Sequence, residues 1–325
     1  MTSSKRYLSG IKPTGDLHLG NYFGAIREHV RLQDDGDGSY FIADYHALTG
    51  LRDAAKFREF VRLTAVTYLA CGIDPSKAVL FRQSDVPEVT ELTWLLLTVT
   101  PVPMLENAVS YKDRKDKGKE VPEMGLMTYP VLMAADILAQ DSDVVPVGRD
   151  QVQHVEMTRD MAQKYNRAFA SDVFRIPEYR LGEAPYVVGI DGQKMSKSYG
   201  NTIPIAAEGK ALEKVVMSIK TDAKGVADPK DPDACNVFKL YALMASDAEK
   251  LALADRYRAG GMGYGEAKKL LLAKVNEVFD PIRARYRALL ARPADVDDVL
   301  RAGAVKARAR ARAVLSRARK ACGID

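Results

Sequence analysis

Two short segments of the chain carry residue types that suit the binding of a polyphosphate. The first is GIKPTGDLHLGN, from Gly10 to Asn21, and the second is KMSKS, from Lys194 to Ser198. Glycines allow backbone amides to approach a ligand closely, and lysine, hydroxyl and imidazole groups place donors beside phosphate oxygens. Phosphoryl and nucleotidyl transfer needs this positioning and charge neutralisation rather than a nucleophilic side chain. Together the two segments predict a site for ATP.

Other kinds of nucleotide, metal and hydrolase site find no support in the sequence. It has neither a G-x-x-x-x-G-K-[ST] loop nor a G-x-S-x-G elbow, and its four histidines lack the spacing of metal ligands. The three cysteines are isolated and odd in number, which is typical of a reducing compartment and argues against disulfides and thiolate metal sites. No apolar run approaches the roughly 18 residues needed to span a bilayer. We therefore expect a cytoplasmic protein with no membrane association and no metal site of its own.

Strands and helices alternate over residues 1–200, which is the pattern of an α/β domain. The expected strands are short and apolar, and they cover Tyr7–Ser9, Tyr40–Ala43, Val79–Arg82, Val144–Val147 and Tyr186–Ile190. An apolar stripe at i, i+3, i+4 spacing predicts a helix over Phe57–Leu69 that ends at Gly72. The alternation favours a Rossmann-like, doubly wound parallel sheet, which binds ligands at the carboxyl ends of its strands. The two ATP segments would then follow the first and the last strand.

Two regions depart from this alternation. Residues 86–140 form a long, mostly helical insertion with the only tryptophan, Trp94, and a basic loop, Lys112–Lys119, and its size suggests subunit contact. After Asn201 the strand pattern stops, and helices are expected over Ala206–Lys220, Asn236–Met244, Asp247–Arg258, Gly265–Leu290 and Val296–Ala321. We therefore predict a second, helical domain over residues 201–325. Its run from Arg301 to Lys320 has eight Lys/Arg and no acidic residue, and fits either a solvated helix face or a contact with nucleic acid.

The two ATP segments resemble the HIGH and KMSKS signatures of the class I aminoacyl-tRNA synthetases. Three further segments are similar to motifs of the bacterial tryptophanyl-tRNA synthetases: DYHALT from Asp44, TYPVLMAADIL from Thr128 and VPVGRDQ from Val145. The resemblance extends from about Leu8 to Ala318. It implies a homodimer that activates L-tryptophan with ATP, accompanied by Mg²⁺, to tryptophanyl-adenylate and pyrophosphate. The amino acid would then pass to the 3′-terminal ribose of tRNA(Trp), whose anticodon the helical domain would bind.

The resemblance also implies roles for individual residues. The catalytic groups would be His18, Lys194, Ser196 and Lys197. The ATP site would be formed by Lys12, Pro13, Thr14, Gly20, Asn21, Gly148, Arg149, Asp150, Val187, Lys194, Met195, Ser196, Lys197 and Ser198. The tryptophan pocket would be formed by Ser9, Gly10, His46, Tyr129, Met133, Asp136 and Gln151. Many relatives carry Gln at the positions of Lys12 and Tyr45 and Glu at that of Arg149, so here Lys12 adds a cation beside the phosphates.

Asp136 is the residue on which the choice of amino acid would depend. Tryptophan offers one polar side-chain atom, an N–H donor, so its selection needs one fixed acceptor in an apolar pocket. Asp136 lies in the apolar stretch MAADIL, where a buried charge is costly without a partner. From the residues alone Asp136 could equally face solvent, and Tyr129 and Met133 could be plain core. Alternative functions are a tyrosine-specific relative, a nucleotidyltransferase of the same superfamily and a non-catalytic paralogue that binds nucleic acid.

Overall fold

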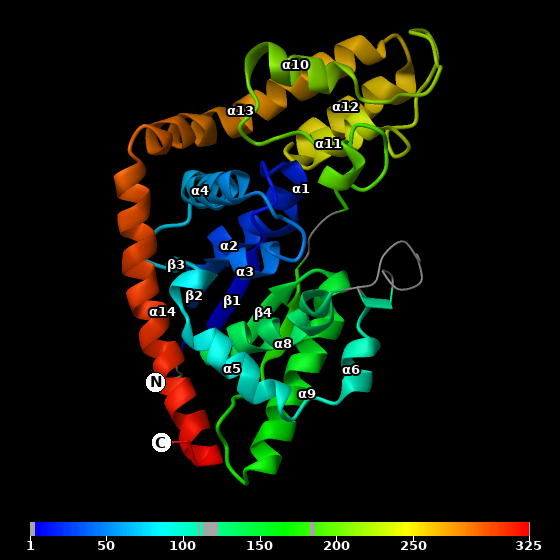
Figure 1. The fold of residues 1–325 in the computed structure, drawn as a ribbon. Coiled ribbons are helices and arrows are strands. Elements are labelled where there is room, and N and C mark those ends of the chain that lie inside the picture. The colour runs from blue at the N-terminus through cyan, green and yellow to red at the C-terminus, as the bar shows by residue number, and fades with distance from the viewer. Residues whose placement is uncertain (1–3, 110, 113–122, 183–185, 325) are drawn as a thin grey trace.

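The computed structural model describes residues 4–109, 111–112, 123–182 and 186–324, and shows an α/β domain joined to a group of helices (Figure 1). Its strands are β1 (Arg6–Ile11), β2 (Asp37–Ile42), β3 (Val79–Arg82), β4 (Val144–Val147) and β5 (Glu178–Leu181). They form one parallel sheet in the order β3-β2-β1-β4-β5, with Ser9 opposite Tyr40 and Ser39 opposite Val79. The strand order reverses between β1 and β4. The predicted doubly wound parallel sheet is therefore confirmed, and the reversal marks the crevice where such sheets bind ligands.

Helices make up most of the remaining structure. Those before residue 200 are α1 (Leu19–Asn21), α2 (Arg27–Leu32), α3 (Asp44–Ala47), α4 (Ala54–Cys71), α5 (Glu88–Leu97), α6 (Val102–Glu106), α8 (Met124–Ala139) and α9 (Val152–Ala168). Those after it are α10 (Gly209–Met217), α11 (Asn236–Ala242), α12 (Asp247–Ala259), α13 (Tyr264–Leu290) and α14 (Pro293–Cys322). A π-helical turn, Tyr22–Ile26, joins α1 to α2, and 3-10 turns cover Gln83–Asp85, Arg149–Gln151 and Lys197–Tyr199. The helix expected to end at Gly72 and the five expected after Asn201 are all confirmed.

Each face of the sheet has its own core, because alternate residues of a strand point to opposite faces. Tyr40, Ile42 and Leu80 belong to the cluster on the α4 side, which continues into the C-terminal helices. Phe41 and Phe81 belong to the other cluster, together with buried residues of α5, α8 and α9. Helices on both faces leave the strand ends as the exposed edge of the sheet, where a ligand can enter.

The expected fifth strand, Tyr186–Ile190, is wrong. The fifth strand is β5, whose four side chains are all exposed, so it has no apolar pattern to reveal it. Tyr186–Ile190 is instead one arm of a short hairpin, in which Val188 makes an isolated bridge with Lys194. Val187 and Val188 are apolar because they are buried in the core on the α4 side, rather than because they pair in the sheet. The second ATP segment therefore follows a hairpin arm, not the last strand.

The last helix, α14, leaves the other C-terminal helices and returns to the sheet, where it runs beside β3 (Figure 1). Its first turns, at Val296 and Leu300, belong to the core on the α4 side. Its later turns, at Ala307 and Val314, belong to the core on the opposite face. The helix thus crosses the β3 edge of the sheet. We accordingly restrict the predicted helical domain to α10–α13 and assign α14 to the α/β domain.

The predicted insertion, residues 86–140, contains the helices α5, α6 and α8. Trp94 on α5 is 66% exposed and Met124 at the start of α8 is 67% exposed. The predicted basic loop, Lys112–Lys119, lies outside the described residues apart from Lys112. Among the described residues, none of the helices combines the length and apolar composition needed to cross a bilayer.

Candidate functional site

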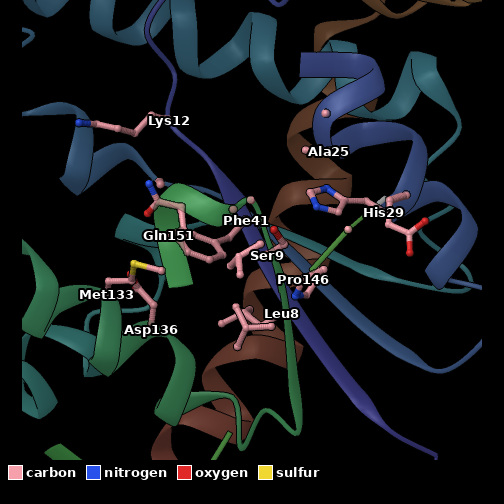
Figure 2. A pocket seen from close by; sticks show the side chains of 18 of the residues that line it. Leu8, Ser9, Lys12, Ala25, His29, Phe41, Met133, Asp136, Pro146 and Gln151 are labelled. Atoms are coloured by element: carbon pink, nitrogen blue, oxygen red, sulfur yellow. The ribbon is translucent and has the colours of Figure 1, made fainter. Parts of the chain in front are cut away.

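A cavity of about 970 Å³ extends from the carboxyl ends of β1, β2 and β4 beside α8 to the turn Tyr22–Ile26 and α2 (Figure 2). All seven residues predicted for the tryptophan pocket line it: Ser9, Gly10, His46, Tyr129, Met133, Asp136 and Gln151. Lys12 and Gly148, both predicted for ATP, line it as well. A Cβ atom at Gly10 would lie 2.6 Å from the Phe41 ring, so the wall at this point requires glycine. Residues far apart in sequence converge here because the ends of parallel strands share one edge of the sheet.

Asp136 is buried in the wall of this cavity, with 5% of its surface exposed. Its two carboxylate oxygens accept hydrogen bonds from Nε2 of Gln83 at 2.9 and 2.8 Å, and Oδ2 lies 2.9 Å from Nε2 of His46. Burial raises the pKa of Asp136, while the hydrogen bonds from His46 and Gln83 and the charge of His46 act in the opposite direction. The interpretation that Asp136 faces solvent is therefore wrong. It is a fixed acceptor whose oxygens keep lone pairs for a ligand.

Gln83, which the sequence analysis missed, fixes the orientation of that carboxylate. It directly follows β3 and is 1% exposed. While its Nε2 donates to Asp136, its Oε1 accepts from the backbone N–H groups of Tyr45 at 3.0 Å and His46 at 3.4 Å. The amide is thus held at both ends. The only sequence signal is a polar residue directly after a buried strand, which is common in α/β domains.

A second hydrogen-bond chain leads from the cavity to the turn after β4. The Tyr129 hydroxyl lies 2.5 Å from Nε2 of His154, and Nδ1 of His154 lies 3.1 Å from Oε1 of Gln151. Nε2 of Gln151 in turn donates to the Asp150 carboxylate at 3.0 Å. The chain connects Tyr129 and Gln151, both predicted for tryptophan, with Asp150, predicted for ATP. His154, its central member, was not among the predicted site residues.

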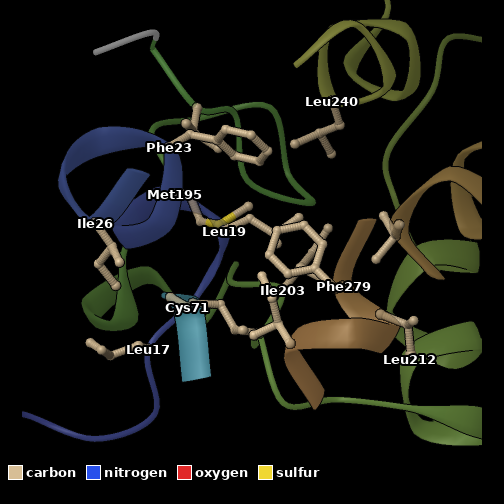
Figure 3. Packing of buried hydrophobic residues seen from close by; sticks show 14 of the residues in the cluster. Leu17, Leu19, Phe23, Ile26, Cys71, Met195, Ile203, Leu212, Leu240 and Phe279 are labelled. Carbon is tan, nitrogen blue, oxygen red and sulfur yellow. The ribbon is translucent and has the colours of Figure 1, made fainter. Parts of the chain in front are cut away.

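The two ATP segments contact each other directly. The backbone N–H of Gly20 lies 3.3 Å from the sulfur of Met195. Met195 is buried beside Leu19 in the core on the α4 side (Figure 3). Nζ of Lys197 donates to the carbonyl oxygen of Gly15 at 2.8 Å. The segment after β1 and the KMSKS segment therefore form one unit, although about 180 residues separate them in sequence.

Enclosure between the segments changes the acid–base properties of the cationic groups. Desolvation lowers the pKa of Lys197 to about 8, against the opposing charge of Asp16. Desolvation and then the charge of Lys197 lower the pKa of His18 to about 4, so its imidazole is neutral at neutral pH. Nδ1 of His18 is buried with no hydrogen-bond partner among the described residues, and a bound ligand could supply that partner. Desolvation also lowers the pKa of Lys12, whose Nζ donates to Thr49 at 3.1 Å.

Asn201 is a second residue that the sequence analysis missed, and it holds the base of the KMSKS segment. It is 1% exposed. Its Oδ1 accepts from the backbone N–H of Ser196 at 2.7 Å, and its Nδ2 donates to the carbonyl oxygen of Lys194 at 3.0 Å and to Asp191 at 2.8 Å. A Cβ atom at Gly189 would lie 2.3 Å from Nδ2 of Asn201, so this packing requires glycine.

The remaining residues predicted for ATP lie in the same two segments, in the hairpin arm and in the turn after β4. The Thr14 hydroxyl lies 3.4 Å from Nζ of Lys197, and the Asn21 side chain accepts from the His18 backbone at 3.1 Å. Pro13 and Val187 are buried, and the residues that are exposed are Thr14, Gly148, Arg149, Asp150, Lys194 and Ser198. The Ser196 and Ser198 hydroxyls lie 2.9 Å apart.

Comparison with known proteins identifies the family. A family model described as tRNA synthetases class I (W and Y) matches residues 2–280. A tryptophan–tRNA ligase of Rhodopirellula baltica is 52% identical over 320 residues, covering 98% of this chain and 99% of the relative. One of Fusobacterium nucleatum subsp. nucleatum is 50% identical over 322 residues, covering 98% of each chain. The crystal structure of Campylobacter jejuni tryptophanyl-tRNA synthetase complexed with ADP and tryptophan has a TM-score of 0.92 to this structure at 45% identity, and the match covers 98% of this chain and 99% of that one. The chain therefore belongs to the class I tRNA synthetases of the W and Y family.

Proposed function

We propose that this protein is a tryptophan–tRNA ligase, which activates L-tryptophan with ATP and transfers it to tRNA(Trp). The observation that carries the proposal is the buried Asp136 carboxylate, held by His46 and Gln83 in the cavity wall. It supplies one fixed acceptor, which matches the single N–H donor of the indole ring. Relatives at 50 and 52% identity over nearly the whole chain bear this name, which favours tryptophan over tyrosine and over a nucleotidyltransferase.

Activation is an attack of the tryptophan carboxylate on the α-phosphate of ATP, with pyrophosphate as the leaving group. His18, Lys194, Ser196 and Lys197 would stabilise the charge that develops on the phosphates, so no covalent enzyme intermediate is needed. The unpartnered Nδ1 of His18 and the enclosed ammonium of Lys197 support this assignment. Mg²⁺ would arrive with ATP. Over the described ranges, no three His, Cys, Asp or Glu side chains are grouped so that they could hold a metal ion.

The second step brings in a tRNA and, by family resemblance, a second subunit. We assign tRNA(Trp) binding to the helical domain α10–α13 and the homodimer contact to the insertion. Exposed apolar side chains gather on the insertion, where Trp94, Val102, Val109 and Met124 are 66, 58, 49 and 67% exposed. Such side chains are typical of a surface that is covered in an assembly. The three cysteines are free thiols, which suits the reducing cytoplasm in which we place the enzyme.

Exchange of pyrophosphate with ATP, measured with each of the twenty amino acids and without tRNA, tests the proposal. We expect exchange with tryptophan. Asp136→Ala should lower kcat/KM for tryptophan by roughly 10- to 100-fold, because the indole N–H loses its acceptor, and should change that for phenylalanine little. Asp136→Asn, which keeps an acceptor without the charge, should be intermediate. Exchange with tyrosine alone, or with none of the twenty, would contradict the assignment.

A further inference from the structure

The helix α13 carries a buried arginine close to the first ATP segment. The ring of Phe279 on this helix packs edge-on against the rings of Tyr22 and Phe23, with centroids 5.0 and 6.2 Å away. Arg283 follows one turn further along α13, and only 2% of its surface is exposed. A buried cation is costly unless its donors are used, so its hydrogen bonds indicate what it does.

The guanidinium of Arg283 is held by its own helix and reaches a segment outside it. Nη1 donates to the side-chain oxygens of Asn276 and Asp280, each at 2.8 Å. The Asp280 side chain is 63% exposed, and Nη2 of Arg283 has no partner among the described residues, so this is not a closed ion pair. Nε donates to the carbonyl oxygen of Ile205 at 3.2 Å. Of the hydrogen bonds that Arg283 makes to described residues, this is the one that leaves α13.

Ile205 ends a short extended segment that begins at Ile203 and pairs with the residues on either side of His18. The N–H of Ile205 donates to the carbonyl oxygen of Leu17 at 2.9 Å, and the N–H of Leu19 donates to that of Ile203 at 3.0 Å. His18 itself forms an isolated antiparallel bridge with the middle residue of the segment. Leu17, Leu19 and Ile203 all belong to the core on the α4 side (Figure 3). The backbone of His18 is thus fixed by a hydrogen bond on each side.

We propose that Arg283 is a positioning residue for the ATP site, because its N–H fixes the segment that in turn fixes the backbone of His18. This inference rests on the proposed function, in which His18 stabilises charge on the phosphates. The same segment continues from Asn201, which accepts from the backbone N–H of Ser196 in the KMSKS segment. The support that Arg283 provides is therefore shared by both ATP segments.

Loss of the Arg283 donor would leave the carbonyl oxygen of Ile205 unpaired, in a residue that is 2% exposed. The segment would shift to regain a partner, and His18 would shift with it. Charge stabilisation counts most in the transition state, so the displacement should lower kcat more than it raises KM. The residues proposed for tryptophan lie on other elements, such as His46 on α3 and Asp136 on α8. The KM for tryptophan should therefore change little.

Arg283→Met and Arg283→Gln form a matched pair for this test. The amide nitrogen of glutamine is as many bonds from the backbone as Nε of arginine, so it can donate to Ile205 without a charge, whereas methionine has no donor. In pyrophosphate exchange with tryptophan, we expect Arg283→Met to lower kcat by roughly 10-fold, with a KM for tryptophan within about twofold of wild type. Arg283→Gln should restore kcat to within about twofold of wild type.

Arg285→Met is the control on the same helix. Nε of Arg285 also donates to a backbone carbonyl, that of Ala70 at the end of α4, at 2.7 Å. Its loss should leave kcat unchanged, because the hydrogen bonds around His18 do not involve it. If Arg283 acts through His18, Arg283→Met should add little to the loss caused by His18→Ala.

Amide hydrogen exchange, followed by mass spectrometry, tests the contact without any need for activity. Peptides that contain the Leu19 and Ile205 amides should exchange faster in Arg283→Met, and at the wild-type rate in Arg283→Gln and Arg285→Met. An unchanged kcat in Arg283→Met, a glutamine variant as impaired as the methionine variant, or fully additive losses with His18→Ala would overturn the proposal. A wild type that exchanges pyrophosphate with no amino acid would refute the proposed function instead, and amide exchange would then decide on Arg283. If circular dichroism shows that Arg283→Met is unfolded, the kcat of Arg283→Gln decides alone.

Discussion

At the scale of single residues, Lys197 lies in a setting that makes its charge sensitive to pH. Its ammonium is enclosed between the two ATP segments, and desolvation lowers its pKa to about 8. A lowered lysine pKa means that the cation is present below pH 8 and is lost as the pH rises through that value. Because kcat/KM reports groups of the free enzyme, we expect kcat/KM for ATP in pyrophosphate exchange to fall on the alkaline side, with an apparent pKa of about 8.

Lys197→Arg is the matched variant for this measurement, because a guanidinium stays charged throughout the accessible pH range. The alkaline fall should move to higher pH in this variant, even if its maximal rate is lower. Burial also lowers the pKa of Lys12, so Lys12→Arg serves as the comparison. An alkaline fall that moves in Lys12→Arg and stays in place in Lys197→Arg would show that Lys12, not Lys197, is the titrating cation.

Residues of the site differ in how far the sequence reveals them. Asp136 is conspicuous because a carboxylate within an apolar stretch is unusual, but that stretch alone leaves its exposure open, and its role is implied by the family resemblance. Gln83 and Asn201 are buried even more deeply, yet an amide beside a strand end or a loop is common. Gln83 also finds its partner Asp136 at a separation of 53 residues, a contact that only the assembled sheet creates. Short sequence patterns therefore reveal the residues that contact a ligand more easily than they reveal the buried residues that orient those side chains.

At the scale of elements, the backbone of α14 lies very close to that of β3 at Gly303. A Cβ atom there would lie 1.9 Å from the carbonyl oxygen of Leu80, far inside van der Waals contact with backbone that cannot rotate away. Gly303→Ala should therefore push the helix off the strand and lower the free energy of unfolding by about 3 kcal/mol or more, although alanine favours helices. Urea denaturation followed by circular dichroism measures the change.

Gly265 on α13 is the matched control for this substitution. It is an exposed helical glycine, and nothing lies within 4 Å of the position that its Cβ would take. Gly265→Ala should stabilise the protein by about 0.5–1 kcal/mol, because alanine loses less backbone entropy on folding. Equal effects of the two substitutions would mean that α14 is not seated against β3 as the structure has it.

Secondary structure could be predicted wherever burial imposes a period on the sequence. α4 has an apolar stripe, a capping Asp53 and a terminal Gly72 with φ of 115°, and its ends follow from those residues. β5 could not be found in this way, because an exposed edge strand has no buried face to mark it. The hairpin arm at Tyr186–Ile190 misleads for the opposite reason, since its valines are buried without joining the sheet. An apolar pattern in the sequence thus indicates that a segment is buried. It indicates strand pairing only where the buried segment also joins the sheet.

At the scale of the whole molecule, most arginines in the basic run of α14 form ion pairs with carboxylates of the same chain. Arg308 and Arg312 both contact the Glu88 carboxylate, each at 2.9 Å. Three further arginines of the run pair with carboxylates of the α/β domain, namely Arg310 with Asp37, Arg317 with Asp141 and Arg319 with Glu91. These contacts tie α14 across the edge of the sheet. These arginines remain partly exposed, so the run is a solvated face that is also paired with carboxylates of the same chain.

Glu88 is the carboxylate that both Arg308 and Arg312 contact, and its side chain is only 8% exposed. Burial opposes its ionisation, yet hydrogen bonds from Arg308 and Arg312 outweigh burial and hold the pKa of Glu88 below its usual range. A lowered carboxyl pKa contributes stability above the pKa of the unfolded chain, and that stability is lost as pH falls through the folded value. The arginines matter to the fold chiefly as partners of a carboxylate that is enclosed at the start of α5.

Replacing both arginines by methionine tests this role. Arg308→Met with Arg312→Met leaves Glu88 buried without a cation, and should cost about 1–3 kcal/mol in the free energy of unfolding at pH 7. This is less than the 3–5 kcal/mol of a fully buried pair, because both arginines are partly solvated. Adding Glu88→Met should restore most of the loss, since an apolar triad needs no partner.

Lys306→Met with Lys320→Met is the control, because neither lysine has a carboxylate partner within the described part of the chain. That pair should change stability by less than about 0.5 kcal/mol. A triple variant as unstable as the double, or a lysine pair as costly as the arginine pair, would show that α14 is held by its apolar face alone.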